Sequence, residues 1–345
     1  MMMKNRIKLI IAFLSLLLLI FLMLVNNYYR KYFGSNVTDK QKYLYIHTGA
    51  TYMDVAKTIE QAGIVYDTSS FLQIAQKMDY PEKVKPGKYR LKRGMSNRQL
   101  INMLKAGNQE PVKLAFQNIR LKENFVGMVA KKIESDSLSM IRLLDSSTFV
   151  AKYGFNKDNI YVMFIPNSYE LYWNTSAEKF FGRMYDEYQK FWTEERKIKA
   201  KSIGLNPIEV SILASIVDGE ALHDKEMPMI AGLYMNRYNQ GIALEADPTV
   251  IFANHDFTIH RVLNKHLRVE SPYNTYIHKG LPPGPINMPS IKAIDAVLNY
   301  TKHNYIYMCA KDDFSGYHNF ASTIQEHQHN AQKFQKALNE RNIKK

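Results

Sequence analysis

Residues 206–224, NPIEVSILASIVDGEALHD, decide how the C-terminal part of the chain folds, because they predict one short helix. Asn206 is a preferred N-cap residue, and Pro207 suits the first helical position. Glu209 completes an Asn-x-x-Glu capping box. The start of this helix is therefore specified by three neighbouring residues.

The apolar face of this helix carries a carboxylate. Leu213, Ile216 and Glu220 recur at spacings of three and four, so Glu220 lies on the stripe that the helix buries. Burial disfavours the anion, and we expect a raised pKa for the Glu220 carboxyl, as a general acid near neutral pH requires. Asp218 lies roughly 200° round the helix and points elsewhere. The alternative is a helix-end Glu that reaches solvent or pairs with Arg or Lys.

Composition sets the broad class of the protein. The 345 residues, of which 46% are hydrophobic, suffice for two ordinary domains or one large domain with an appendage. The net charge of +14 fits nucleic acid, anionic lipid or another anionic polymer as partner. The single cysteine, Cys309, excludes an intrachain disulfide, and its apolar surroundings predict a buried structural thiol. The ten histidines show no metal-ligand spacing, so we expect no metal and no cofactor.

The N-terminus predicts a membrane anchor. Residues 1–8 form a basic leader, and residues 9–25 are an apolar run interrupted only by Ser15. We expect a transmembrane helix over residues 9–27 and a linker over residues 28–42. A cleaved signal peptide is the rival, but no small-x-small site follows the run. The short leader favours an N-terminus inside the cell, which makes nucleic acid an unlikely partner.

A small α+β region is predicted over residues 43–110. Residues 44–63 and 89–107 form a weak repeat, each changing from strand to helix at a glycine turn, with Thr51 and Ser96 as matching N-caps. Such units bind or position something, or act as a spacer with their own core. We expect residues 111–200 to connect this region to residues 201–345 and to form the first part of the region that carries the Glu220 helix.

One loop is unusually stiff. Residues 271–290, SPYNTYIHKGLPPGPINMPS, hold five prolines and two glycines beside Tyr273, Asn274, Thr275 and Tyr276. Proline fixes the backbone, which suits a cleft wall, and Tyr and Asn can stack on sugar rings and bond hydroxyl groups. The alternative is a rigid structural crossover.

Several motifs in one order resemble the endolytic murein transglycosylase family, also called the YceG-like family. They are LASIVDGE, IAGLYMNR, LEADPTV, YNTYIHKGLPPGPI and YHNFASTIQEH. The resemblance spans nearly the whole chain. It implies an α+β fold with an N-terminal transmembrane helix, a small LysM-like region and a larger mixed α+β catalytic domain.

The resemblance also implies a reaction. Such enzymes are peptidoglycan lyases that cut the β-1,4 bond between N-acetylmuramic acid and N-acetylglucosamine without water and leave 1,6-anhydro ends. The catalytic position of the family is Glu220 here, while Asp218, Glu245 and Asn167 stand where the family usually has Glu, Gln and Asp. Neutral groups that could ease the positive charge of the transition state are Asn236, Tyr273, Asn274 and Thr275. The full set of candidate substrate-binding residues is Asn236, Arg237, Glu245, Asp247, Thr249, Tyr273, Asn274, Thr275, Tyr276 and His318.

The resemblance further implies partners and a location. We expect peptidoglycan glycan strands as substrate and peptidoglycan synthases or penicillin-binding proteins as partners. The single-pass anchor would lie in the cytoplasmic (inner) membrane, with the catalytic domain on the extracytoplasmic side. Three alternatives stay open: a muramidase-type hydrolase in which Asp247 or Glu245 activates water, a non-catalytic peptidoglycan-binding scaffold, and a nucleic-acid binder.

Overall fold

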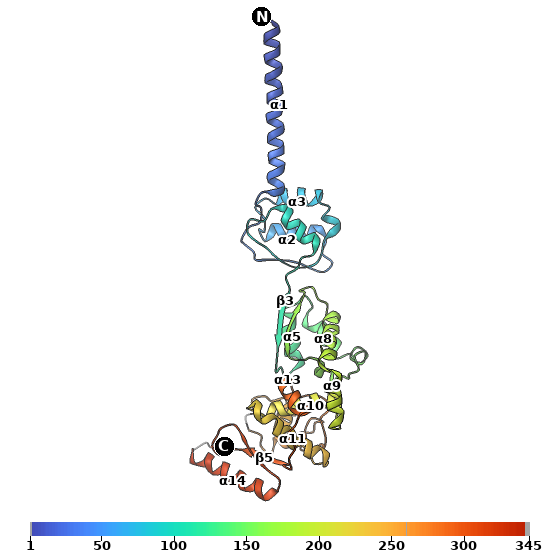
Figure 1. The fold of residues 1–345 in the computed structure, drawn as a ribbon, viewed down its shortest axis with the longest axis vertical. Coiled ribbons are helices and arrows are strands. Elements are labelled where there is room, and N and C mark those ends of the chain that lie inside the picture. Colours follow the sequence, from blue (N-terminus) through green and yellow to red (C-terminus); the bar gives the residue numbers. More distant parts are fainter. Residues whose placement is uncertain (1, 260, 342–345) are drawn as a thin grey trace. The chain divides into compact units, whose positions relative to one another are not determined.

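The computed structural model describes residues 2–259 and 261–341, and the chain divides into two compact units (Figure 1). Unit 1 comprises Met1–Lys113, Lys132–Glu134 and Glu170–Thr175, and unit 2 comprises Leu114–Lys131, Ser135–Tyr169 and Ser176–Lys345. The architecture is mixed α+β, as the sequence predicts, with an apolar helix at the N-terminus. Each of the sheets is a single pair of strands, so helices supply most of the core.

Unit 1 begins with the long helix α1 (Met2–Phe33), which is long and apolar enough to cross a membrane. The end of α1 packs against α3 and α4. The remaining elements of unit 1 are β1 (Tyr43–Ile46), α2 (Tyr52–Gln61), α3 (Thr68–Lys77), the 3-10 helix η1 (Pro81–Lys83), β2 (Gly87–Arg90) and α4 (Asn97–Ala106).

The predicted strand–turn–helix repeat is present in unit 1. Strands β1 and β2 pair antiparallel, with Tyr43 opposite Arg90. The helices that follow them, α2 and α4, start with capping boxes at Thr51 and Ser96, as predicted. The apolar faces of α2, α3 and α4 close over this strand pair in one core. A LysM-like character of this region stays a prediction.

The expected linker over residues 28–42 differs from the structure. Helix α1 continues to Phe33, and the next residues are part of unit 1. Val37 is fully buried and bridges to Val65, while Ser35 bridges to Ser96. Some polar residues of this segment are buried. The Asn36 side chain, for example, donates hydrogen bonds to backbone and side-chain oxygens inside the unit. The polar composition of residues 28–42 therefore did not reveal that part of this segment packs into unit 1.

Unit 2 is built mainly from helices. Strands β3 (Val112–Phe116) and β4 (Asn167–Leu171) form a pair, and the division between the units falls within both strands. The helices are α5 (Lys122–Ala130), α6 (Ser137–Leu144), α7 (Ser147–Ala151), η2 (Ile160–Met163), α8 (Ala177–Phe191), α9 (Glu194–Ser202), α10 (Pro207–Glu220), η3 (Asp224–Glu226), α11 (Met227–Asn239), α12 (Asp247–Ala253), η4 (His266–Arg268), α13 (Ile291–Leu298) and α14 (Ile324–Glu340), with strands β5 (Tyr307–Ala310) and β6 (His318–Ala321) before α14.

Helix α10 is the centre of unit 2. It packs against α11, α12 and α13, and every residue from 210 to 217 is buried (Figure 1). Its start confirms the sequence prediction: Asn206 accepts from the backbone N–H of Glu209, whose side chain accepts from the N–H of Asn206. The helix thus fixes the position of its last residue, Glu220.

The strand pair β5–β6 lies against α14. Strand β5 is only partly buried. For the same reason Cys309 is not the buried thiol that its apolar neighbours predict, because it lines a cavity and is partly exposed. Apolar residues here form the wall of a pocket.

Candidate active site

A cavity of about 350 Å³ in unit 2 contains the end of α10. Its walls come from α10, α11, α12, the stiff loop, the β5–β6 pair and α14. Its lining residues are Glu220, Leu233, Tyr234, Arg237, Leu244, Glu245, Asp247, Tyr276, Ile306, Tyr307, Met308, Cys309, Ala310, His318 and His327.

Glu220 is an acid of this cavity with a raised pKa. The hydroxyl of Tyr234, from α11, donates to Glu220 Oε1 at 2.7 Å. Burial raises the pKa of Glu220 from 4.5 to about 7, and the charge of Asp247 adds to this effect, while the Tyr234 hydrogen bond opposes it. Near neutral pH the Glu220 carboxyl therefore exists in both protonated and ionised forms, so it can give and take a proton.

A close approach of two helices brings Asp247 near Glu220. A Cβ on Gly219 would come within 2.9 Å of the Pro248 Cβ, so only glycine lets the start of α12 pack against the end of α10. Asp247 accepts a hydrogen bond of 2.7 Å from the Tyr276 hydroxyl. Burial and this bond raise the pKa of Tyr276, which keeps its hydroxyl protonated as a donor.

A second carboxylate of the cavity is held by an arginine. Arg237 is buried and donates to the backbone oxygens of Ala243 and Ile306 and to the carboxylate of Glu245. Glu245 has a φ of +53°, an unusual conformation for a residue other than glycine. The backbone at Glu245 is thus held in a strained form beside the cavity, which is common at functional sites.

Two histidines complete the wall. The buried Glu226 accepts from both the backbone N–H of His318 and its Nδ1, at 2.7 and 2.8 Å. This bond places the His318 ring proton on Nδ1 in the neutral form and fixes the ring. His327, from α14, stacks on Tyr307, and within the described residues its buried Nδ1 has no hydrogen-bond partner.

The YceG-like family model matches residues 44–333, which is most of the chain. The chain belongs to the YceG-like family. Proteins named endolytic murein transglycosylase are similar to it: one from Bacillus subtilis strain 168 is 26% identical over 86% of this chain and 85% of its own length. Another, from Streptococcus pneumoniae D39, is 25% identical over 83% of this chain and 57% of its own length. The chain thus spans little more than half of the pneumococcal relative.

The fold of this YceG-like chain also has a solved counterpart. The crystal structure of a YceG-like protein from Listeria monocytogenes matches with a TM-score of 0.57 at 23% identity, covering 83% of this chain and 97% of the other. The match supports the fold of the YceG-like chain.

The cavity gathers six of the eleven residues that the sequence singled out. They are Glu220, Arg237, Glu245, Asp247, Tyr276 and His318. Three of these six residues carry carboxyl groups, and two, Arg237 and His318, are of basic types. Polar groups therefore surround the Glu220 carboxyl. The sequence predictions about what these side chains do remain predictions.

The other five candidates do not line this cavity. Asn274 is fully buried and donates to the backbone oxygens of Leu267 and Val269. Thr275 and Thr249 are buried and share a hydrogen bond of 2.8 Å. Asn236 donates to two backbone oxygens before β5, and Tyr273 lines a separate cavity beside α12. These polar side chains shape the loops, and their expected contact with substrate stays a prediction.

The local sequence pattern predicts the orientation of Asp218 but not the contact of Tyr234 with Glu220. Asp218 accepts from the Ser290 hydroxyl at 2.7 Å at the start of α13, so it points away from Glu220, as the helix geometry predicts. Tyr234 is not among the residues that the sequence singled out. A signal was present, because a buried tyrosine hydroxyl needs a partner. His327 likewise sits on an amphipathic helix with no local sign that it reaches a cavity.

No group of three or more His, Cys, Asp or Glu side chains that could hold a metal ion occurs within residues 2–259 and 261–341.

Proposed function

We propose that this chain is a membrane-anchored endolytic lytic transglycosylase of peptidoglycan, with Glu220 as its single acid–base catalyst. The observation that carries the proposal is the partly buried Glu220 carboxyl, whose pKa desolvation raises to about 7, on the wall of a cavity in a YceG-like fold. The names of the relatives from Bacillus and Streptococcus support the same reaction.

The reaction needs one proton donor and one proton acceptor in sequence. Protonated Glu220 donates its proton to the glycosidic oxygen while the bond from that oxygen to C1 of N-acetylmuramic acid breaks. The resulting carboxylate takes the proton of the muramoyl 6-hydroxyl while its oxygen bonds to C1. The products are a free 4-hydroxyl and a 1,6-anhydro end, no water is consumed, and Glu220 is again protonated. A pKa of about 7 suits both steps near neutral pH.

Tyr234 is a positioning residue for this acid. Its hydroxyl donates to one oxygen of Glu220, which fixes the carboxyl group and stabilises the carboxylate formed after the first step. Burial strongly raises the pKa of Tyr234, so the tyrosine remains a donor throughout the reaction.

The remaining carboxylates offer electrostatic stabilisation. An oxocarbenium-like transition state carries positive charge at the sugar ring, and negative groups fixed in a partly enclosed site stabilise it. Asp247, held by Tyr276, and Glu245, held by Arg237, lie in the same cavity and can supply this field. Both are oriented by neighbours, so little reorganisation is needed as charge develops.

We further propose that α1 spans the cytoplasmic membrane with its N-terminus inside, which would hold the catalytic domain near newly made glycan strands on the outer side. The length and apolar composition of α1 support the span. Peptidoglycan synthases are the partners that this placement favours.

The test is digestion of purified peptidoglycan by the full-length chain, with products analysed by mass spectrometry. We expect 1,6-anhydro ends from the wild type and none from Glu220→Gln. Asp218→Asn is the matched control, because this neighbouring acid bonds Ser290 outside the cavity and Asn keeps the acceptor oxygen. Loss of cleavage in both variants, with folding intact, would remove the special role of Glu220.

A hydrolase is the second candidate, because Asp247 and Glu245 in the cavity could activate water. Its products would carry free reducing ends, which contain one more water than anhydro ends. A scaffold without catalysis predicts that Glu220→Gln changes no product and no cellular phenotype.

A further inference from the structure

Four basic residues surround the junction between α1 and the rest of unit 1. Arg30 and Lys31 belong to the last turns of α1, Lys77 ends α3, and Arg98 lies in the first turn of α4. Among the residues that the structure describes, none of the four forms an ion pair with a carboxylate. We call Arg30, Lys31, Lys77 and Arg98 the basic collar.

Two collar residues rest on aromatic rings of α1. The Lys77 ammonium lies 4.5 Å from the centre of the Tyr28 ring, and the Arg98 guanidinium lies 5.2 Å from that of Phe33. Such cation–π contacts hold the charged groups close to the helix surface. The charged groups of Lys77 and Arg98 therefore lie near the surface of α1 while their side chains stay exposed.

The junction itself is rigid. The Asn97 amide donates to the backbone oxygen of Lys31 in α1 and to the Ser70 hydroxyl in α3, and it accepts from the Asn36 amide. The side chains of Asn36, Ser70 and Asn97 are buried. A buried, satisfied polar network of this kind fixes one arrangement of α1, α3 and α4. The collar is thus held at a constant height along α1.

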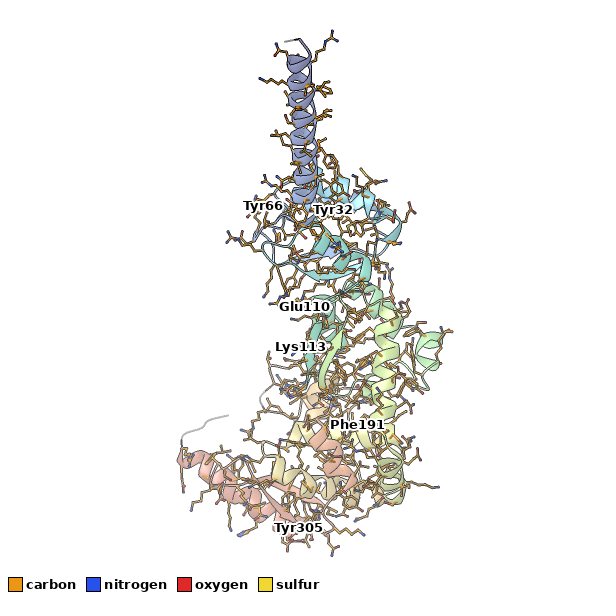
Figure 2. All side chains as sticks on the ribbon, turned by 45° about the horizontal axis from the view of Figure 1, so that its top comes forward. Tyr32, Tyr66, Glu110, Lys113, Phe191 and Tyr305 are labelled. Atoms are coloured by element: carbon orange, nitrogen blue, oxygen red, sulfur yellow. The ribbon has the colours of Figure 1, made fainter. Side chains whose placement is uncertain are left out.

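That height coincides with the surface of a bilayer. A hydrocarbon core of about 30 Å takes about 20 helical residues, so a core centred on residues 9–25 ends near residue 27. Tyr28 is the next residue, and the headgroup layer beyond it is about 5 to 8 Å thick. With α1 spanning the membrane as proposed, the Lys77 ammonium, which contacts the Tyr28 ring, falls in this layer. In Figure 2, Tyr66, which is 66% exposed, and Tyr32 lie at a similar level, where α1 enters unit 1.

We propose that this face of unit 1 lies in the lipid headgroup layer and binds anionic phospholipid through the basic collar, an inference that rests on the proposed membrane span of α1. Four cations face two carboxylates nearby, Asp67 at the start of α3 and Asp79 just after its end, so the charge surplus is positive. Lipid phosphates pair with the collar cations, and exposed Tyr66 is of the type enriched at membrane interfaces. Unit 1 would then be seated on the membrane surface by α3 and α4 as well as tethered by α1.

The depth of this face can be measured on the full chain. Cys309 is the only cysteine, so Cys309→Ser with Tyr66→Cys gives one site for a nitroxide label. We expect the label in lipid nanodiscs to be shielded from a water-soluble paramagnetic reagent. Asn108→Cys is the control, because it is exposed and lies two residues from Glu110, which Figure 2 shows at the end of unit 1 away from α1. Equal exposure of both labels would overturn the proposal.

The anionic preference can be measured by native mass spectrometry with phosphatidylglycerol and phosphatidylcholine. Each basic residue near an anionic surface strengthens the attraction about fivefold, so Lys77→Gln with Arg98→Gln should weaken phosphatidylglycerol binding by up to about 25-fold. Lys88→Gln with Lys113→Gln is the matched control, because it also removes two cations from unit 1 and Figure 2 shows Lys113 far from α1. An equal effect of both double variants, or no preference for phosphatidylglycerol, would contradict the collar's role.

The test of lipid binding can succeed or fail independently of the test of peptidoglycan cleavage. Glu220→Gln should keep the lipid preference and lose cleavage, whereas the collar variant should lose the lipid preference and still cleave isolated peptidoglycan. A chain that cleaves but shows no collar effect would refute this inference and leave the proposed function intact.

Discussion

Glu220→Gln should stabilise unit 2 at neutral pH, although it removes the proposed catalyst. Burial raises the pKa of Glu220 from 4.5 to about 7, so the folded state holds the proton more tightly than the unfolded state. Unit 2 therefore loses stability as the pH rises from 4.5 to 7. The difference between the two pKa values corresponds to about 3 kcal/mol above pH 7. Glutamine is neutral at every pH, and its oxygen can still accept from Tyr234.

The assay is denaturant unfolding of the full chain between pH 4 and pH 8.5, followed by tryptophan fluorescence. The chain has two tryptophans, and Trp173→Phe leaves Trp192, which is buried in unit 2, as the only reporter. We expect the free energy of unfolding of Glu220→Gln, relative to the parent, to increase by about 3 kcal/mol between pH 4.5 and pH 7 and then to stay constant.

Asp256→Asn is a control of opposite sign in the same unit. Hydrogen bonds from Thr258 lower the pKa of Asp256, so this carboxylate adds stability that is lost as the pH falls. The Asn variant should therefore be less stable than the parent at neutral pH and should approach it in acid. If the Glu220→Gln difference does not change with pH, or changes in the same direction as that of Asp256→Asn, then Glu220 is not a buried acid with a raised pKa.

Further variants test the neighbours of this acid. Tyr234→Phe removes a hydrogen bond that lowers the pKa of the acid, and Asp247→Asn removes a charge that raises it, so pH profiles of cleavage should move to higher and lower pH, respectively, by about one unit. Gly219→Ala places a Cβ against a proline and should cost about 1–3 kcal/mol by thermal unfolding, whereas Gly127→Ala, with open space, should not destabilise. Thr275→Val should cost about 1–3 kcal/mol, because it leaves the buried backbone N–H of Ala246 without its partner and removes one hydrogen bond of the Thr249 hydroxyl; unchanged stability with lost cleavage would instead indicate a substrate contact.

The elements that the sequence predicted well are those with local signals. The capping box at Asn206 and the spacing of Leu213, Ile216 and Glu220 are properties of one helix, and they give both its start and the burial of its acid. The strand–turn–helix repeat of unit 1 is likewise encoded by N-caps and periodicity within about 20 residues. Local chemistry determines such features because helix hydrogen bonds and caps join neighbouring residues.

The site as a whole could not be obtained from local patterns. Tyr234 reaches Glu220 only because α11 packs on α10, and His327 reaches the cavity from a helix more than 100 residues later in the chain. The stiff loop shows that residue type alone does not reveal a side chain's structural role. A loop that crosses the protein interior needs polar side chains for its own backbone, so Asn274 and Thr275 are used for structure although their types suit sugar binding.

A single catalytic carboxyl must satisfy two opposite demands, and this explains why its surroundings are mixed. An acid in a fully apolar pocket would have a strongly raised pKa and would be a poor proton donor. An acid among several hydrogen-bond donors would have a lowered pKa, would remain ionised and could not protonate the leaving oxygen. At Glu220, burial and the charge of Asp247 raise the pKa, and the hydroxyl of Tyr234 lowers it. The two effects come from different helices, α12 and α11, that meet at the end of α10. The close packing at Gly219 is therefore part of the pKa control, because it sets how near the charge of Asp247 can come to the carboxyl that it perturbs.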